Sequence, residues 1–172
     1  MNTLFTKYLA SYCAVALLMA LMGLSGCAAG PQGSYHTFSI DGAYDKWSQS
    51  IDLLEYDYGG VHSMVRDKGK SEADKVSTFT SINATMPNGE YLYAKWRIKS
   101  TGEVIEKRVD LRGRLPDNML NHGITFVIDG QQLYIFLITP TKKIYGAPPI
   151  LRTYRSKSYV SYEIYPNNTF KK

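Results

Sequence analysis

The sequence is poor in the residue types that build disulfide frameworks and metal clusters. Its 172 residues include only two cysteines and three histidines. The cysteines are Cys13 and Cys27, both near the start of the chain. The long segment after them has no thiol, which excludes a disulfide, a thiolate nucleophile and a cysteine-ligated metal there. We therefore expect the hydrophobic core alone to hold the fold, and no cofactor to be bound.

Recognisable catalytic motifs are also missing. The sequence contains no Gly-x-Ser-x-Gly elbow, no His-Glu-x-x-His zinc motif and no phosphate-binding loop. His36, His62 and His122 lack the spacing of metal ligands, so we expect them in polar surface or turn positions. A Ser–His–Asp site assembled from distant strands is the alternative that spacing leaves open. We expect a protein that is not an enzyme.

The first segment lacks charge. Lys7 is its single charged residue, and residues 13–22 run without a polar group. This is the pattern of a secretory signal peptide, which we place at residues 1–26. A transmembrane anchor is the alternative, but the apolar stretch is at the lower limit of length for crossing a bilayer.

The signal region ends in Leu24-Ser25-Gly26-Cys27, which resembles the lipobox of bacterial lipoproteins. The resemblance implies that the mature protein begins at an acylated Cys27. Ala28 follows it, and this favours the outer membrane, facing the periplasm. Stable anchoring needs about two lipid chains, which such an acylated cysteine exceeds. Residues 27–34 would then be the lipidated cysteine and a flexible tether rich in small residues.

Residues 35–172 have the composition of one folded domain. The chain is 44% hydrophobic and 13% aromatic, which argues against disorder. Its dominant hydrophobic period is two, the period of strands. Short strands are expected at 35–40, 51–58, 76–82 and 159–165, and helix signals are weak. Turn signals about every 10 residues predict an antiparallel β-sandwich or open barrel built from hairpins.

Residues 91–111 are predicted to form one hairpin. A connection of two or four residues keeps the apolar side chains on one face. With Thr101-Gly102 as a two-residue turn, Ile98 would face Ile105. Trp96 lies on the apolar face and is predicted to be a core residue. The apolar residues of the first strand are Leu92, Ala94, Trp96 and Ile98.

Residues 124–138 are predicted to form a second hairpin. Asp129-Gly130 is typical of a type I′ turn and would set Phe126 against Leu133. Both faces of this hairpin are apolar, so we expect it in the centre of a sheet or between layers. Pro140 is expected to end it. The loops 59–75 and 139–158 are long enough to suggest a function or mobility.

Basic and aromatic residues gather in two places after these strands. Two arginines surround Gly113 where a strand should end, and the 139–158 loop is rich in lysine, arginine and tyrosine. The net charge of +5 could simply favour solubility, or it could attract an acidic protein or phospholipid head groups. Nucleic acid is not expected outside the cytoplasm. The candidate partner-binding residues are Arg112, Arg114, Lys142, Lys143, Tyr145 and Arg152.

Several segments resemble a group of small bacterial lipoproteins. They are FSIDGAY at 38–44, GEYLYAKWRIKSTGEVIEKRVDLRGRLP at 89–116, FVIDGQQLYIFLIT at 126–139 and YVSYEIYPNN at 159–168. The group includes the immunity lipoproteins of type VI secretion lipase effectors. The resemblance implies a lipid-anchored β-sandwich that binds and neutralises a secreted lipase toxin without catalysis. The alternative is a structural lipoprotein of an envelope or secretion assembly, docking through the 59–75 loop.

Replacing Cys27 by serine should release the protein from the membrane without unfolding the domain. Serine offers no thiol for the lipid, and Cys27 makes no disulfide in the expected fold. Membrane fractionation and circular dichroism check the two halves of this expectation. A Cys27→Ser variant that stays membrane-bound, or that loses its β-sheet spectrum, would contradict it.

Overall fold

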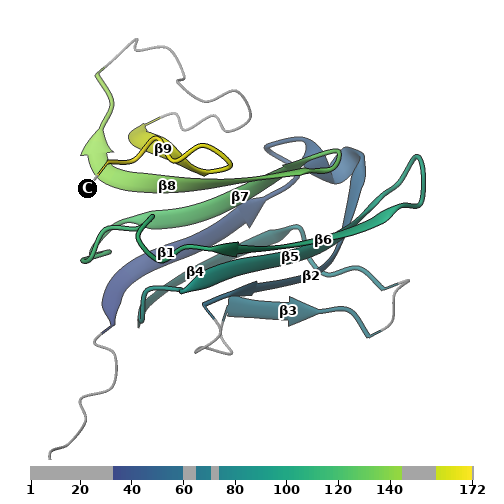
Figure 1. Cartoon of the computed structure of the whole chain (residues 1–172), viewed down its shortest axis with the longest axis horizontal. Coiled ribbons are helices and arrows are strands. Elements are labelled where there is room, and N and C mark those ends of the chain that lie inside the picture. The colour runs from purple at the N-terminus through teal and green to yellow at the C-terminus, as the bar shows by residue number, and fades with distance from the viewer. Residues whose placement is uncertain (1–32, 60–64, 71–73, 145–157, 172) are drawn as a thin grey trace, which may run out of the picture. The chain divides into compact units, whose positions relative to one another are not determined.

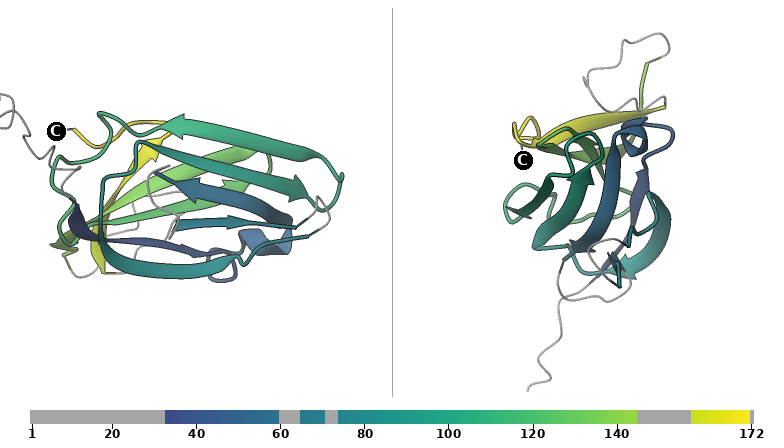
Figure 2. Two further views of the ribbon diagram at one scale, coloured as in Figure 1. Left: turned by 90° about the horizontal axis from the view of Figure 1, so that it is seen from below. Right: turned by 90° about the vertical axis from the view of Figure 1, so that its right-hand side faces the viewer.

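The protein folds as two β-sheets packed face to face (Figures 1 and 2). The computed structural model describes residues 33–59, 65–70, 74–144 and 158–171. Within these ranges no helix is long and apolar enough to cross a membrane. The elements are β1 (Ser34–Asp41), the 3-10 helix η1 (Trp47–Gln49), β2 (Ile51–Tyr58), β3 (Arg66–Lys68), β4 (Phe79–Met86), β5 (Tyr91–Ile98), β6 (Val104–Asp110), β7 (Gly123–Asp129), β8 (Gln132–Lys142) and β9 (Tyr159–Tyr165).

The first sheet has the strand order β4-β1-β7-β8-β9, and the second has the order β3-β2-β5-β6. All pairings are antiparallel except the short one between β1 and β7, which is parallel. This arrangement confirms the predicted β-rich fold and selects the sandwich over the open barrel. The predicted strand at 76–82 lies a few residues later, as β4, and β3 lies inside the predicted 59–75 loop.

The β5–β6 hairpin confirms the predicted faces but corrects the predicted pairing. Trp96 faces Ile105, and the backbone N–H of Ile98 bonds the carbonyl of Glu103. The connection therefore has four residues, which is one of the two predicted lengths. The shift from the two-residue turn is even, so every side chain keeps its face of the sheet.

The β7–β8 hairpin also differs from its predicted turn by an even shift. Asp129 pairs with Gln132, so the two turn residues are Gly130 and Gln131, and Phe126 faces Ile135. Gly130 has a φ of 58° whereas Gln131 has no positive φ. A positive φ at only the first turn position is the pattern of a type II′ turn, which corrects the type I′ prediction.

The predicted central position of β7 and β8 is confirmed, because their side chains are buried on both faces. Pro140 does not end β8, which continues to Lys142. It lies where the pairing of β8 with β9 is interrupted, between Ile138 and Lys142. Proline has no N–H to donate, so a sheet tolerates it at such an irregularity.

An aromatic cluster joins the two sheets. Phe38 of β1 stacks on Tyr56 and Tyr58 of β2, with ring centroids 5.8 Å and 5.3 Å apart. Phe126 of β7 lies 6.2 Å from Phe38 on the same side. Trp96 is fully buried, as predicted, and its Nε1–H donates to the carbonyl of Gly130 over 2.9 Å. The inner faces of both sheets thus meet through large rings.

Trp96→Ala should lower the free energy of unfolding by about 3–5 kcal/mol, because it empties a fully buried site. Trp96→Phe isolates the hydrogen bond to Gly130. Its matched control is Trp47→Phe, since Trp47 is also buried but its Nε1 has no hydrogen-bond partner among the described residues. Denaturant titration should show Trp96→Phe to be the more costly by about 1 kcal/mol. Equal losses in the two phenylalanine variants would contradict this assignment.

Candidate partner-binding surface

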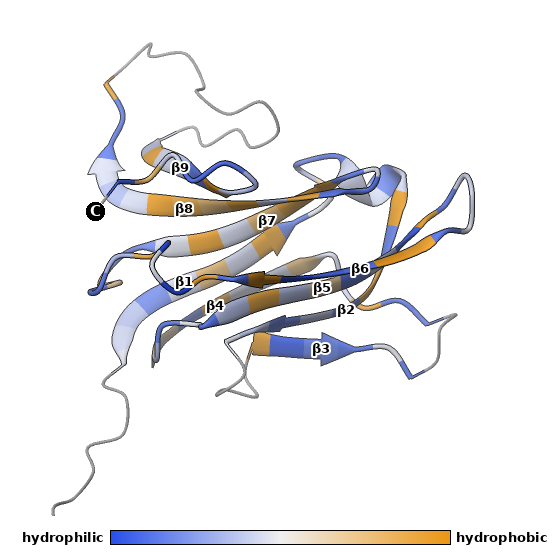
Figure 3. Ribbon diagram, in the orientation of Figure 1, coloured by the Kyte–Doolittle hydropathy of each residue, from blue (hydrophilic) through white to orange (hydrophobic). Residues whose placement is uncertain are grey.

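The outer face of the second sheet is lined by tyrosine and charged side chains, whereas its inner face forms part of the hydrophobic core. Successive side chains of a strand alternate between the faces. Figure 3 shows that β3 is mostly hydrophilic, whereas long stretches of β7 and β8 in the first sheet are hydrophobic. The outward residues of β5 and β6 are Tyr91, Tyr93, Lys95 and Arg97, and Val104, Glu106, Arg108 and Asp110.

Contacts between neighbours fix Tyr91 on this face. The guanidinium carbon of Arg108 lies 3.3 Å from the centre of the Tyr91 ring, a cation–π contact. The Tyr91 hydroxyl donates to the Asp57 carboxylate over 2.9 Å. Arg66 lies 3.0 Å from the same Asp57 oxygen. The ring is therefore held from its face and from its hydroxyl end.

Arg112 follows β6 in the turn that contains Gly113, whose φ is 75°. Its Nε donates to Oδ1 of Asp110 over 3.0 Å, and its Nη2 donates to Oδ2 over 2.7 Å. These hydrogen bonds hold the pKa of Asp110 down at about 2. The pair is solvent-exposed, so it orients the guanidinium without contributing much to stability.

Arg112 and Tyr91 line the same shallow cleft, which we call the tyrosine–arginine cleft. Its volume is about 350 Å³. Two arginines and two carboxylates balance the charge of the cleft, so a complementary partner carries both positive and negative groups. Tyrosine and arginine are the residues that most often concentrate binding energy in interfaces. The cleft is lined by Glu90, Tyr91, Arg108, Asp110 and Arg112.

Arg114 has a different position from Arg112 although only Gly113 separates them. Its Nη1 donates to the carbonyl of Ile164 in β9 over 2.7 Å. Its guanidinium carbon lies 6.0 Å from the ring of Tyr165. Arg114 therefore ties the turn after β6 to the first sheet.

The remaining predicted residues do not join this cleft in the described structure. Lys142 is exposed at the end of β8, where it pairs with Tyr159. Lys143 is half-buried, and its backbone N–H bonds the carbonyl of Ser158. Cys27, Tyr145 and Arg152 lie outside the described residues.

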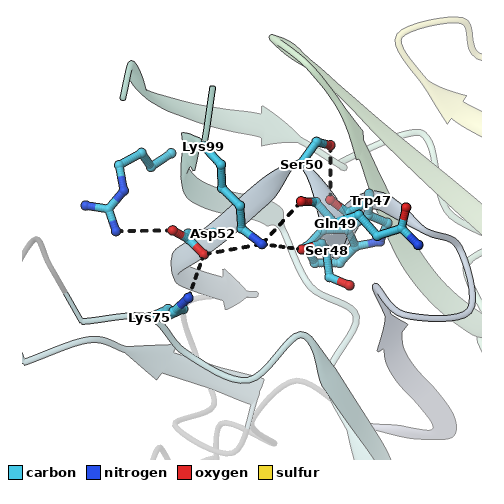
Figure 4. A network of polar contacts seen from close by, with 8 residues as sticks. Trp47, Ser48, Gln49, Ser50, Asp52, Lys75 and Lys99 are labelled. Carbon is cyan, nitrogen blue, oxygen red and sulfur yellow. Dashed lines mark hydrogen bonds and ion pairs between the residues drawn. The ribbon is translucent and has the colours of Figure 1, made fainter. Parts of the chain in front are cut away.

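A cluster of cations around Asp52 was not predicted from the sequence. Figure 4 shows Lys75 and Lys99 converging on the Asp52 carboxylate, with Nζ–O distances of 3.0 Å and 3.7 Å. Arg97 approaches to 3.4 Å. Burial alone would raise the pKa of Asp52, but the hydrogen bond and charge of Lys75, with Lys99 and Arg97, lower it. No sequence signal pairs β2 with β5, and that pairing brings Asp52 opposite Arg97.

His36 corrects the prediction that the histidines lie in surface or turn positions. It is fully buried in β1. Its Nδ1 lies 2.8 Å from the carbonyl of Ser34, so Nδ1 carries the proton, and its Nε2 accepts from the Tyr58 hydroxyl over 3.1 Å. The Tyr58 hydroxyl in turn accepts the N–H of Gly89. Within the described structure, a carbonyl and a hydroxyl thus occupy the two ring nitrogens of His36. His122 does lie in a turn, and His62 is outside the described residues.

The pKa values of His36 and Asp45 are shifted in opposite directions. Burial lowers the pKa of His36 below 6.5, with the nearby charge of His122 adding to the effect. Burial and the neighbouring Asp41 raise the pKa of Asp45 to about 6. No three or more His, Cys, Asp or Glu side chains of the described segments are grouped to hold a metal ion.

Between pH 7 and pH 5, His36 and Asp45 should therefore make opposing contributions to the pH dependence of the free energy of unfolding. His36 binds its proton more readily when unfolded, so its contribution is present above pH 6.5 and is lost as the pH falls. Asp45 binds its proton more readily when folded, so its contribution grows as the pH falls through 6. His36→Gln should make the domain more stable at pH 5 than at pH 7, and Asp45→Asn should make it less stable. Denaturant titrations at both pH values check this, and parallel profiles for the two variants would contradict it.

Comparison of the chain with known protein families, curated proteins and solved structures finds no match. The functional assignment therefore rests on the residues and contacts described above.

Proposed function

We propose that this chain is a lipid-anchored envelope protein that binds a secreted lipase toxin and neutralises it stoichiometrically, without catalysis. The observation that carries the binding role is the tyrosine–arginine cleft. It combines aromatic area with two oriented arginines on an exposed sheet face. Orienting these side chains in advance reduces the entropy lost when a partner binds.

The location and the toxin class have separate support. The lipobox-like Leu24-Ser25-Gly26-Cys27 directly follows an apolar run, and an anchor there would hold the domain on the membrane that a lipase attacks. The choice of a lipase effector rests on the resemblance of residues 38–168 to immunity lipoproteins. The cleft supports protein binding, whereas the class of partner is inferred from that resemblance alone.

Arg112→Ala should weaken the complex with the proposed lipase effector by about 2 kcal/mol or more, a factor of roughly 30. The loss is expected because the guanidinium is exposed, oriented by Asp110 and free to be covered by a partner. Lys75→Ala is the matched control: it also removes an exposed, ion-paired cation, but one that pairs with Asp52 and does not line the cleft. Arg114→Ala should instead lower the stability of the domain, because it breaks the bond to Ile164. Titration calorimetry and thermal unfolding separate the two effects.

Survival of cells that express the effector in the periplasm tests the function itself. Cells with this protein should survive, and cells with the Arg112→Ala variant should survive less well. Equal killing with and without the protein, together with no complex by size-exclusion chromatography, would contradict the proposal and favour the structural role. Protection that is unchanged by Arg112→Ala would place the toxin on another surface.

A further inference from the structure

The two sheets have four edge strands, and three of them carry the usual protection against pairing with another chain. An unpaired edge exposes a row of N–H and C=O groups that another strand can bind. β3 is only three residues long. β6 carries charge at Glu106, Lys107 and Arg108. The carbonyl of Glu163 in β9 already accepts the N–H of Thr169 from the following segment.

Among the described residues, β4 has such a protection only at its first residue, Phe79. This strand is eight residues long, reads FTSINATM and contains no charged residue. The four residues that face outward are all exposed, and Phe79 retains 66% of its surface. They are Phe79, Ser81, Asn83 and Thr85.

The backbone N–H and C=O groups of the same four residues point away from β1, toward the free edge of the sheet. Gly42 donates its N–H to the carbonyl of Thr78, which continues the β1–β4 register. In an antiparallel ladder the residues that bond to the neighbour alternate. The backbone groups of Thr80, Ile82 and Ala84 therefore face β1, and those of the alternate residues face outward.

One end of this free edge is already closed. The Ser77 hydroxyl donates to the carbonyl of Phe79 and accepts the N–H of Phe79. The edge that remains consists of Ser81, Asn83 and Thr85, with Asn83 at its centre. A three-residue edge with a central residue matches itself under a two-fold rotation.

We propose that β4 pairs with β4 of a second copy of this chain, antiparallel about a two-fold axis at Asn83, to join the two five-stranded sheets into one. In this register Asn83 faces Asn83 of the second copy, and Ser81 faces its Thr85. All outward backbone groups of these three residues then find partners. The inference does not rest on the toxin-binding role and uses a different sheet from the tyrosine–arginine cleft.

The side chains suit this self-pairing. Asparagine carries both a donor and an acceptor; Oδ1 of Asn83 accepts from the Thr37 hydroxyl, and its second lone pair and its amide group can bond to Asn83 of the second copy. Serine and threonine opposite each other form a favourable hydrogen-bonding pair. β6 is less suited to self-pairing, because a two-fold axis at Lys107 would set two lysines directly opposite each other.

Sedimentation equilibrium of residues 32–172, which form one compact unit, tests the proposal. The wild-type domain should show a concentration-dependent dimer. Ser81→Lys with Thr85→Lys should raise the dissociation constant at least about tenfold, because it creates two lysine–lysine pairs across the axis. Ser81→Lys with Thr85→Glu changes the same positions but creates opposite-charge pairs, so it should remain dimeric.

A disulfide test fixes the register. Residues 32–172 contain no cysteine, so a single introduced thiol reports one position. Asn83→Cys should form a disulfide-linked dimer on mild oxidation, because directly opposite Cα atoms in such a pair are about 5.5 Å apart. Thr85→Cys should not form one alone but should crosslink to Ser81→Cys when the two proteins are mixed.

A wild-type domain that stays monomeric up to about 1 mM would overturn the proposal. So would a dimer that the two double variants affect equally, or one in which Thr85→Cys crosslinks to itself as readily as Asn83→Cys. A monomeric domain that instead binds the effector, with Ser81→Lys and Thr85→Lys abolishing that binding, would assign β4 to the toxin and also overturn the self-pairing.

Discussion

The rest of the structure depends on the contact between the inner faces of the two sheets, centred on Phe38. Its ring stacks on Tyr56 and Tyr58 and lies beside Phe126, so β1, β2 and β7 are held in one register across the sandwich. Alternation along each strand then determines which side chains face outward. Tyr91 and Arg108 reach the surface because Leu92 and Val109 are needed inside. The position of the candidate site is thus a consequence of core packing.

Alternation also explains which features the sequence predicts well. The β5–β6 connection has one of the two predicted lengths, and the β7–β8 register is wrong by an even number of residues, so Trp96 and Phe126 keep their faces of the sheets. A burial pattern of period two distinguishes odd from even shifts but not one even shift from another. The choice between two even shifts depends on turn conformation, such as the positive φ of Gly130.

The features that the sequence did not predict depend on contacts with residues far away in the chain. His36 is buried because Tyr58, 22 residues away, offers its hydroxyl, and no local pattern indicates that contact.

Arg112 and Arg114 show why the candidate site is only partly readable from sequence. Both were predicted as partner-binding residues from the same short pattern. The acceptor of Arg112 is Asp110, two residues away, so the side chain stays at the surface. The acceptor of Arg114 is the carbonyl of Ile164, 50 residues away, which only the folded sandwich brings close. Composition identifies residues capable of binding, and the topology decides which of them remain available to a partner.

The two proposals fit one arrangement on a membrane. Ser34 pairs with Met86, three residues from Asn83, so in an antiparallel β4 pair the two chains would enter their sheets about 20 Å apart along the strand direction. If Cys27 is acylated as proposed, the six residues from it to Gly33 have a maximum reach of about 20 Å, similar to the separation of the two chain entries. Anchoring raises the effective concentration of one copy near another, and a pairing that is weak in solution can then persist. The tyrosine–arginine cleft lies on the other sheet, so pairing through β4 leaves the outer face of β5 and β6 open to a partner.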